Sequence, residues 1–311
     1  MPLFHIRCPA KVNLSLSVLE RDEAAGMHFL DSVLAKIDLY DELSIRIEPV
    51  RRFEARFHWA TRGPRPAAIA PAQNTMSRAY DLLDKALGNS LPGMSVTATN
   101  AIPAGAGLGG ASSDAAGLIK LIRFLGTRTA ALPTAAAVGL ARMDARQLVE
   151  MASRVGADVP AFLCEGPVRV GGFGEEVTKL ELPGLEDYRL LLVFPPQPLS
   201  TGEMYARIGE SARHNHTAGF VERWTTSGPG KALRLAHNDF EEVARQALPI
   251  IGDVIDSLRA QRFPLVSLTG TGSAVFVLLK RDAAVEQLNL PREVRISGPH
   301  VFVHSDPCQE S

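Results

Sequence analysis

Hydrophobic and polar residues alternate near the start of the chain. Within residues 5–20 the apolar side chains recur at every second position, at Val12, Leu14, Leu16 and Val18. A period of two is typical of a β-strand with one buried face, because successive side chains of a strand point to opposite faces. The pattern therefore predicts a strand whose polar face is available for function.

The following segments predict a second strand, a helix, a third strand and another helix. Residues 40–47 alternate again, and Asn74, a favoured N-cap residue, precedes apolar positions with helical spacing. Residues 93–102 predict the third strand, and the spacing within residues 113–124 predicts a buried helix. A glycine-rich run joins these last two elements.

The second half of the chain continues to mix helices and strands. Asp144 and Gln147 have the spacing of a capping box, which predicts the start of a helix that Gly156 ends. The pattern farther along predicts strands at 168–172 and 188–194, a largely helical segment at 243–259, and a strand after a glycine turn within 265–279.

The length of the chain favours two domains. It has 311 residues, and a single hydrophobic core usually stops growing at about 250–300 residues. We therefore expect one domain at residues 1–175 and a second at residues 176–311, with the boundary within residues 165–185.

Composition and charge indicate a folded globular protein without a general affinity for polyanions. Hydrophobic residues make up 46% and charged residues 22% of the chain, as in ordinary globular proteins. Lys and Arg total 33 and Asp and Glu 34, so the net charge is -1, and no general attraction to nucleic acid or to an anionic membrane is expected.

The cysteines and the hydropathy pattern indicate a cytoplasmic protein. Cys8, Cys164 and Cys308 are far apart and lack the spacing of a zinc site or a disulfide framework. Arg7 and Lys11 interrupt the apolar run that a signal peptide needs. No stretch approaches the roughly 20 apolar residues that span a bilayer.

The glycine-rich run from Pro103 to Ser113, called the glycine loop below, carries the strongest chemical signal. Without side chains in the way, backbone N–H groups can face an anion, and the start of a helix adds unpaired donors and a partial positive charge. The run has neither the lysine of the P-loop pattern nor the context of a dinucleotide fingerprint. A tight strand-to-helix turn is the alternative, but the position before a predicted helix favours a phosphate site.

The residues themselves support an anion site at this loop, and the family resemblance given next implies that the loop and Asn74 bind ATP. Hydroxyl groups at the helix start suit a phosphate oxygen or Mg²⁺, so Ser113 is also the candidate metal ligand. The loop residues are Pro103, Ala104, Gly105, Ala106, Gly107, Leu108, Gly109, Gly110, Ala111, Ser112 and Ser113.

The loop resembles the phosphate loop of the GHMP kinases, the superfamily named after galactose, homoserine, mevalonate and phosphomevalonate kinases. The matching pattern is Pro103-x-x-x-Gly-Leu-Gly-Gly-x-Ser-Ser-x-Ala-Ala116. More narrowly, three segments are similar to the 4-diphosphocytidyl-2-C-methyl-D-erythritol kinases, in the same order along the chain. They are Pro-Ala-Lys-Val-Asn at 9–13, Gly-Ala-Asp-Val-Pro at 156–160 and Leu-Thr-Gly-Thr-Gly-Ser at 268–273.

The resemblance covers nearly the whole chain and implies a fold. This is a two-domain α+β GHMP kinase fold. Its N-terminal, ATP-binding domain is like ribosomal protein S5 domain 2, its C-terminal domain is ferredoxin-like, and the active site lies between them.

The resemblance also implies roles in phosphoryl transfer. Asp158 is implied as the general base for the acceptor hydroxyl, and Lys11 keeps that carboxylate ionised and stabilises the developing alkoxide. Asn13 shares the strand face of Lys11 and is assigned to substrate binding. Taken alone, a lysine on a strand is usually a solvated charge and an aspartate after a glycine is usually a helix cap.

The substrate segment departs from the family pattern. The family usually has Gly-Tyr-His where this chain has Gly-Met-His at 26–28. By resemblance, the cytosine ring lies between Met27 and Tyr205, with His28 at its edge and Thr201 near its other end. An exposed loop histidine is the alternative interpretation of His28.

Four further segments compare with the family to different degrees. The family commonly has a lysine near the adenine, where this chain has Asn100. A helix N-cap explains Asn74 as well as a nucleotide contact does. We interpret residues 238–239 as structural and residues 269–272 as a candidate lining of the substrate cleft.

The leading hypothesis is ATP-dependent phosphorylation of the 2-hydroxyl of 4-diphosphocytidyl-2-C-methyl-D-erythritol, in the non-mevalonate isoprenoid precursor pathway, with ATP and Mg²⁺. A GHMP-type kinase for another small alcohol is one alternative, which Met27 and Asn100 leave open. A nucleotide-binding protein of the same fold without turnover is the other, and Lys11 and Asp158 count against it. The number of subunits stays open, with a homodimer among the options.

Overall fold

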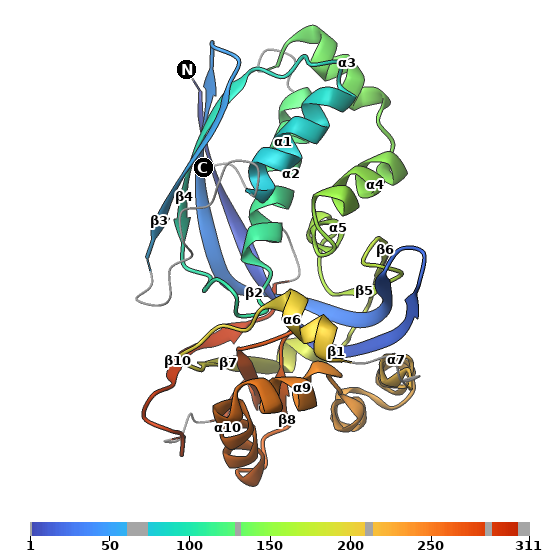
Figure 1. The fold of residues 1–311 in the computed structure, drawn as a ribbon, viewed down its shortest axis with the longest axis vertical. Coiled ribbons are helices and arrows are strands. Elements are labelled where there is room, and N and C mark those ends of the chain that lie inside the picture. The colour runs from blue at the N-terminus through green and yellow to red at the C-terminus, as the bar shows by residue number, and fades with distance from the viewer. Residues whose placement is uncertain (1, 61–73, 128–131, 209–213, 284–287, 304–311) are drawn as a thin grey trace.

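The structure is a computed structural model that describes residues 2–60, 74–127, 132–208, 214–283 and 288–303. Cys308 lies outside these residues. Two β-sheets, each covered by helices, make up the described part of the chain (Figure 1). Among the described residues, no helix combines the length and the hydropathy that crossing a membrane requires.

The first sheet has the strand order β3-β4-β2-β5-β6, with β1 paired to β2. β3 and β4 are parallel, and the other pairs are antiparallel. Its strands are β1 (Leu3–Asp22), β2 (Met27–Glu48), β3 (Phe53–Trp59), β4 (Gly93–Asn100), β5 (Val168–Gly171) and β6 (Glu176–Lys179).

Helices lie on one side of this sheet, in the upper half of Figure 1. They enclose a core that includes Leu83, Val96, Ile119 and Ile122. The helices are α1 (Thr75–Ala86), α2 (Gly110–Thr127), α3 (Thr134–Arg142), α4 (Ala145–Val155) and α5 (Val159–Leu163).

The second sheet is antiparallel, with the order β10-β7-β9-β8. Its strands are β7 (Tyr188–Phe194), β8 (Leu265–Leu268), β9 (Val275–Lys280) and β10 (Arg295–Val301). The helical elements of this half are η2 (Leu185–Asp187), α6 (Thr201–Arg207), α7 (His216–Ser227), α8 (Pro229–Ala232), η3 (Leu233–Leu235), α9 (Phe240–Ala247) and α10 (Pro249–Ala260).

The long strands β1 and β2 contribute to both halves of the molecule. Ile6 and Leu43 lie in the core of the first sheet, whereas Val12 and Ile37 pack with residues of the second sheet. The β1–β2 hairpin therefore covers one face of the second sheet, while α9 and α10 cover the other. The site described below lies along this shared hairpin.

The structure confirms the predicted α+β fold and several local signals. Asn74 caps α1 by accepting a hydrogen bond from the backbone N–H of Met76, and Asp144 and Gln147 form the expected capping box. The helical segment at 243–259 is two helices, because Pro249 begins α10 and cannot continue α9. The residues 265–279 hold two strands, β8 and β9, joined by the glycine turn.

The predicted first strand is present, but its polar face is not open along its length. Lys11, Asn13, Ser15 and Ser17 are all buried, because α7 and the turn at 269–270 cover them. The division of the chain at residue 175 stays a prediction. In the structure β6, which begins at Glu176, still pairs with β5 of the first sheet.

Candidate functional site

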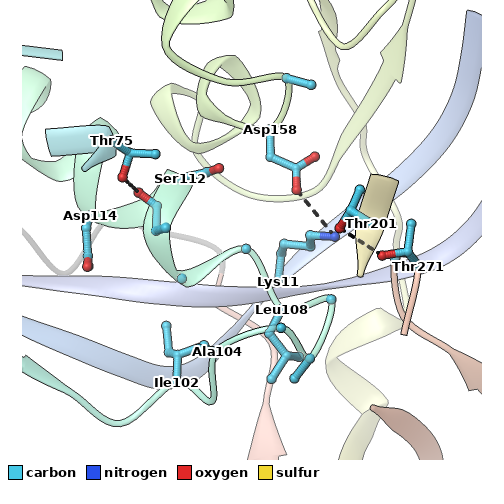
Figure 2. Close-up of a pocket in the computed structure, with 18 of the residues that line it drawn as sticks. Lys11, Thr75, Ile102, Ala104, Leu108, Ser112, Asp114, Asp158, Thr201 and Thr271 are labelled. Atoms are coloured by element: carbon cyan, nitrogen blue, oxygen red, sulfur yellow. Dashed lines mark hydrogen bonds and ion pairs between the residues drawn. The ribbon is translucent and has the colours of Figure 1, made fainter. Parts of the chain in front are cut away.

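One pocket of about 510 Å³ lies where the two halves meet. Its walls come from β1, β2, the glycine loop, the segment before α5, and α6 together with the turn at 270–271. Figure 2 shows side chains from these separate elements pointing into one space. Of the residues assigned from sequence, most line it: Lys11, Asn13, Asn74, residues 103–112, Asp158, Thr201 and Tyr205.

Lys11 and Asp158 face each other across this pocket. Lys11 is 4% exposed, and its Nζ lies 3.5 Å from Asp158 Oδ2 (Figure 2). Asp158 occupies the N-cap position of α5, but its side chain makes no capping hydrogen bond within the described residues. The carboxylate is thus directed at the lysine and the pocket, which argues against the helix-cap interpretation.

Asn13 holds Lys11 in place and joins β1 to the second half of the chain. Its Oδ1 accepts hydrogen bonds from Lys11 Nζ at 2.7 Å and from the backbone N–H of Gly270 at 2.8 Å. Its Nδ2 donates to Ser32 Oγ at 2.8 Å. Asn13 therefore fixes the position of the ammonium group as well as lining the pocket.

The glycine loop adopts backbone conformations that favour glycine. Gly105, Gly107 and Gly109 have φ values of 66°, 75° and 74°, in the left-handed region where a Cβ is unfavourable. The loop is tied to β1, since the Lys11 N–H donates to Leu108 O at 3.0 Å. Its end leads into α2, whose first turn leaves backbone N–H groups without partners in the helix.

The two serines at the start of α2 differ in what they face. Ser112 lines the pocket and is labelled at the helix start in Figure 2. Ser113, the predicted metal ligand, is 2% exposed and is not among the lining residues, and its Oγ has no hydrogen-bond partner in the described part of the chain. The geometry brings Ser112, and not Ser113, to the pocket.

Three buried polar residues at another part of the wall were not singled out as a group from sequence. Asn100 Nδ2 donates to Asp41 Oδ2 at 2.8 Å and to Asp114 Oδ2 at 3.3 Å. Burial raises the pKa of Asp114 well above its usual value, and the charge of Asp41 adds to this effect. Burial also raises the pKa of Asp41, against the opposing effect of its N–H donors. Two neighbouring carboxyl groups in such a place favour sharing a proton.

The predicted substrate residues are only partly brought together. The rings of His28 and Tyr205 stack with centroids 6.0 Å apart, and Thr201 Oγ1 lies 3.1 Å from Thr271 Oγ1. Met27 is 47% exposed, and neither Met27 nor His28 is among the lining residues. The structure thus places the ring of His28, and not Met27, against Tyr205.

Tyr205 forms part of the pocket wall near Asp158. Its ring contacts Phe240 edge-on, with centroids 4.9 Å apart, and both residues line the pocket. Burial raises the pKa of the Tyr205 phenol, and the charge of Asp158 adds to this effect. The phenol therefore stays neutral and serves as a ring surface and hydrogen-bonding group.

Known proteins are similar to this chain in sequence and in structure. The family model described as GHMP kinases N terminal domain matches residues 74–166. A protein from Polaromonas sp. (strain JS666), named 4-diphosphocytidyl-2-C-methyl-D-erythritol kinase, is 34% identical over 90% of this chain and 84% of its own length. A protein of the same name from Thermotoga maritima is 32% identical over 88% of this chain and 91% of its own length.

Solved structures agree with these sequence relatives. A crystal structure of 4-(cytidine 5'-diphospho)-2C-methyl-D-erythritol kinase matches with a TM-score of 0.62 at 29% identity, over 88% of this chain and 90% of that chain. A homoserine kinase from Cytophaga hutchinsonii matches with a TM-score of 0.69 at 17% identity, over 97% of this chain and 96% of that chain. At that identity the second match shows the fold alone.

Proposed function

The chain belongs to the 4-diphosphocytidyl-2-C-methyl-D-erythritol kinase family of GHMP kinases, and we propose that it transfers the γ-phosphoryl group of ATP to the 2-hydroxyl of 4-diphosphocytidyl-2-C-methyl-D-erythritol. The observation that carries this proposal is the Lys11–Asp158 pair, 3.5 Å apart, in the pocket that the glycine loop also lines. On this proposal the chain acts in isoprenoid precursor synthesis in the cytoplasm.

The glycine loop and the start of α2 bind the phosphates of ATP in this proposal. The three glycines with positive φ carry no Cβ, so no side chain of theirs stands between the loop backbone and the pocket. The α2 N-terminus adds a partial positive charge of about half a unit. Asn74 is buried, lines the same pocket and caps α1, so we assign it to shaping the nucleotide site as well.

The residues of the pocket also fit Mg²⁺, which prefers oxygen ligands. Ser112 offers a hydroxyl that lines the pocket. When bound with ATP, Mg²⁺ would neutralise phosphate charge. We therefore move the metal assignment from Ser113 to Ser112.

Asp158 accepts the proton of the acceptor hydroxyl in this proposal. The ammonium group of Lys11 stabilises the alkoxide that develops, because it is desolvated and held by Asn13 rather than free to move. Burial of Lys11 matters here, since an exposed charge would be screened by water.

The cytidine end of the acceptor is assigned to Tyr205 and His28. The rings of these two residues are stacked, and the Tyr205 ring also contacts Phe240. A cytosine base can therefore stack on the face of Tyr205 that His28 covers only if the His28 ring moves or shares that face. Met27 lies outside the pocket with 47% exposure. This observation favours, as a second candidate, a kinase of the same superfamily for another small alcohol.

The test of the proposal is ADP release with ATP, Mg²⁺ and the cytidine-linked acceptor, with the product identified by phosphorus NMR. Asp158→Asn is expected to lower kcat by about 10²- to 10⁴-fold, the usual contribution of a general base. Asp144→Asn is the matched control, because Asp144 is an exposed helix cap and asparagine caps equally well.

Two outcomes would contradict the proposal in different ways. Near-normal turnover in Asp158→Asn would remove the catalytic assignment. Turnover of other small alcohols, together with no competition by CMP against the acceptor, would instead replace the cytidine-linked substrate with the second candidate.

A further inference from the structure

A cluster of two histidines and an aspartate lies outside the pocket. Side-chain ligand atoms of His216, His237 and Asp239 all lie within 4.8 Å of one another. The two imidazole rings are stacked obliquely with centroids 4.3 Å apart, and His237 Nε2 lies 2.8 Å from Asp239 Oδ1. None of these residues lines the pocket or takes part in the proposed kinase reaction.

The fold holds these three residues from two sides of β1. His216 begins α7, and the next residue, Thr217, bonds through its Oγ1 to Ser15 Oγ at 2.9 Å and Ser17 Oγ at 3.2 Å. The segment with His237 and Asp239 follows β1 on the other side. The Leu16 N–H donates to His237 O at 2.7 Å, and the Asp239 N–H donates to Leu16 O at 3.1 Å.

The carboxylate of Asp239 is oriented by a contact of its own. Asp239 is 8% exposed, and its Oδ2 accepts a hydrogen bond from the Val18 N–H at 2.7 Å. This leaves Oδ1 directed toward His237. Hydrogen bonds that orient a ligating carboxylate in this way are typical of metal sites.

We propose that His216, His237 and Asp239 bind one divalent transition-metal ion of the zinc class. Imidazole nitrogen suits zinc, copper, iron and nickel, and a set of two histidines and one carboxylate leaves coordination positions for water. Water can reach these positions, because His216 is exposed and the His237 side chain is 43% exposed. The mixed nitrogen and oxygen set differs from the all-oxygen surroundings that Mg²⁺ prefers.

The ligands of this ion are next to the wall of the pocket. Asn238, between two of the ligands, donates through Nδ2 to Leu268 O at 2.8 Å and to Gly270 O at 3.0 Å. Phe240, the next residue after Asp239, lines the pocket. An ion that joins α7 to the segment at 237–239 would therefore fix the base of the turn that holds Asn13.

The experiment uses the full chain without an affinity tag, stripped of metal with a chelator. Isothermal titration with Zn²⁺ is expected to give one equivalent per chain, and Co²⁺ is expected to give the visible absorption bands of a low-coordinate nitrogen and oxygen site. His216→Ala and His237→Ala are each expected to weaken Zn²⁺ binding by at least about 10-fold, since even residues that only orient ligands change metal affinity by 10- to 100-fold.

His58→Ala is the matched control, because His58 is exposed on β3 in the other sheet. It is expected to leave Zn²⁺ binding unchanged. His216 is exposed, so its alanine variant should fold, and circular dichroism without metal checks this. Absence of saturable Zn²⁺ binding, or equal binding by the His216→Ala and His58→Ala variants, would overturn the proposal.

Discussion

Replacing Gly107 with alanine is expected to force the glycine loop away from the turn at 269–272. Gly107 has a φ of +75°, and a Cβ added to it would lie 2.0 Å from Thr269 O and 3.2 Å from Gly272 O. Real Cβ atoms essentially never come within 3.0 Å of such atoms. The two backbone segments must therefore separate by about 1 Å, the difference between 3.0 Å and 2.0 Å.

Two terms set the size of the effect on stability. A residue with a side chain costs about 1–2 kcal/mol in the left-handed conformation. Separation of the segments would also break the bonds from Thr269 Oγ1 to Gly107 O, at 3.2 Å, and from the Ala274 N–H to Ala106 O, at 3.3 Å. At about 1 kcal/mol for each bond, the whole loss is about 3–4 kcal/mol, a large part of a typical folding free energy.

Urea unfolding followed by tryptophan fluorescence measures this loss, with Gly88→Ala as the matched control. Gly88 has a φ of +67°, but a Cβ there meets no heavy atom within 4 Å among the described residues. The control is therefore expected to lose only about 1–2 kcal/mol, the conformational term. If both variants lose the same stability, the loop and the turn are not in the contact described, and the reasoning is refuted.

Three other predictions follow from the same pocket. Lys11→Met is expected to lower kcat by about 10²- to 10³-fold with little change in the KM for ATP. If steady-state kinetics show a large change in KM instead, Lys11 acts in binding. Ser112→Ala is expected to raise the KM for MgATP by about 10-fold, whereas Ser113→Ala leaves it unchanged. If Ser113→Ala raises this KM and Ser112→Ala does not, the metal ligand is Ser113. The raised pKa of Asp114 means that the native state keeps a proton that the unfolded state releases above about pH 4, so the contribution of this group to stability falls as pH rises toward its native pKa. The Asp114→Asn variant has no group that titrates at this position. Thermal unfolding should therefore show that its stability relative to wild type increases from pH 4 to pH 7. Stability profiles of the two proteins that run parallel over this pH range would contradict the prediction.

Local signals in the sequence predicted which helices and strands form better than they predicted which faces of these elements are buried. The N-caps Asn74 and Asp144 were identified because a capping bond involves residues only a few positions apart. Alternation predicted a strand within residues 5–20, but not that both of its faces are buried. That burial comes from elements such as α7, about two hundred positions away in the chain, and local periodicity carries no information about them.

The same limit applies to the site. Lys11, Asp158 and the glycine loop were identified from family motifs, and the structure brings all three to one pocket. The contact of Asn13 with Gly270 spans 257 positions, so the part that Asn13 plays in holding Lys11 was not predictable from local pattern. His216 and His237 were also missed, because each is an ordinary histidine in the sequence and only the folding of both against β1 makes them a cluster.

The charged residues that line the pocket indicate that phosphate binding and phosphoryl transfer depend on different groups of the protein. Among the described lining residues, Lys11 is the only lysine or arginine, whereas Asp41, Asp114 and Asp158 are acidic. Since the described lining offers one basic side chain, we expect the backbone N–H groups of the glycine loop and the start of α2 to supply most of the protein's attraction for a triphosphate. Burial raises the pKa values of Asp41 and Asp114, which favours their neutral forms and so lowers the negative charge of the wall. In the proposed reaction the ammonium group of Lys11 lies beside Asp158, where a new charge develops during transfer and where a fixed positive charge has its largest effect on the rate.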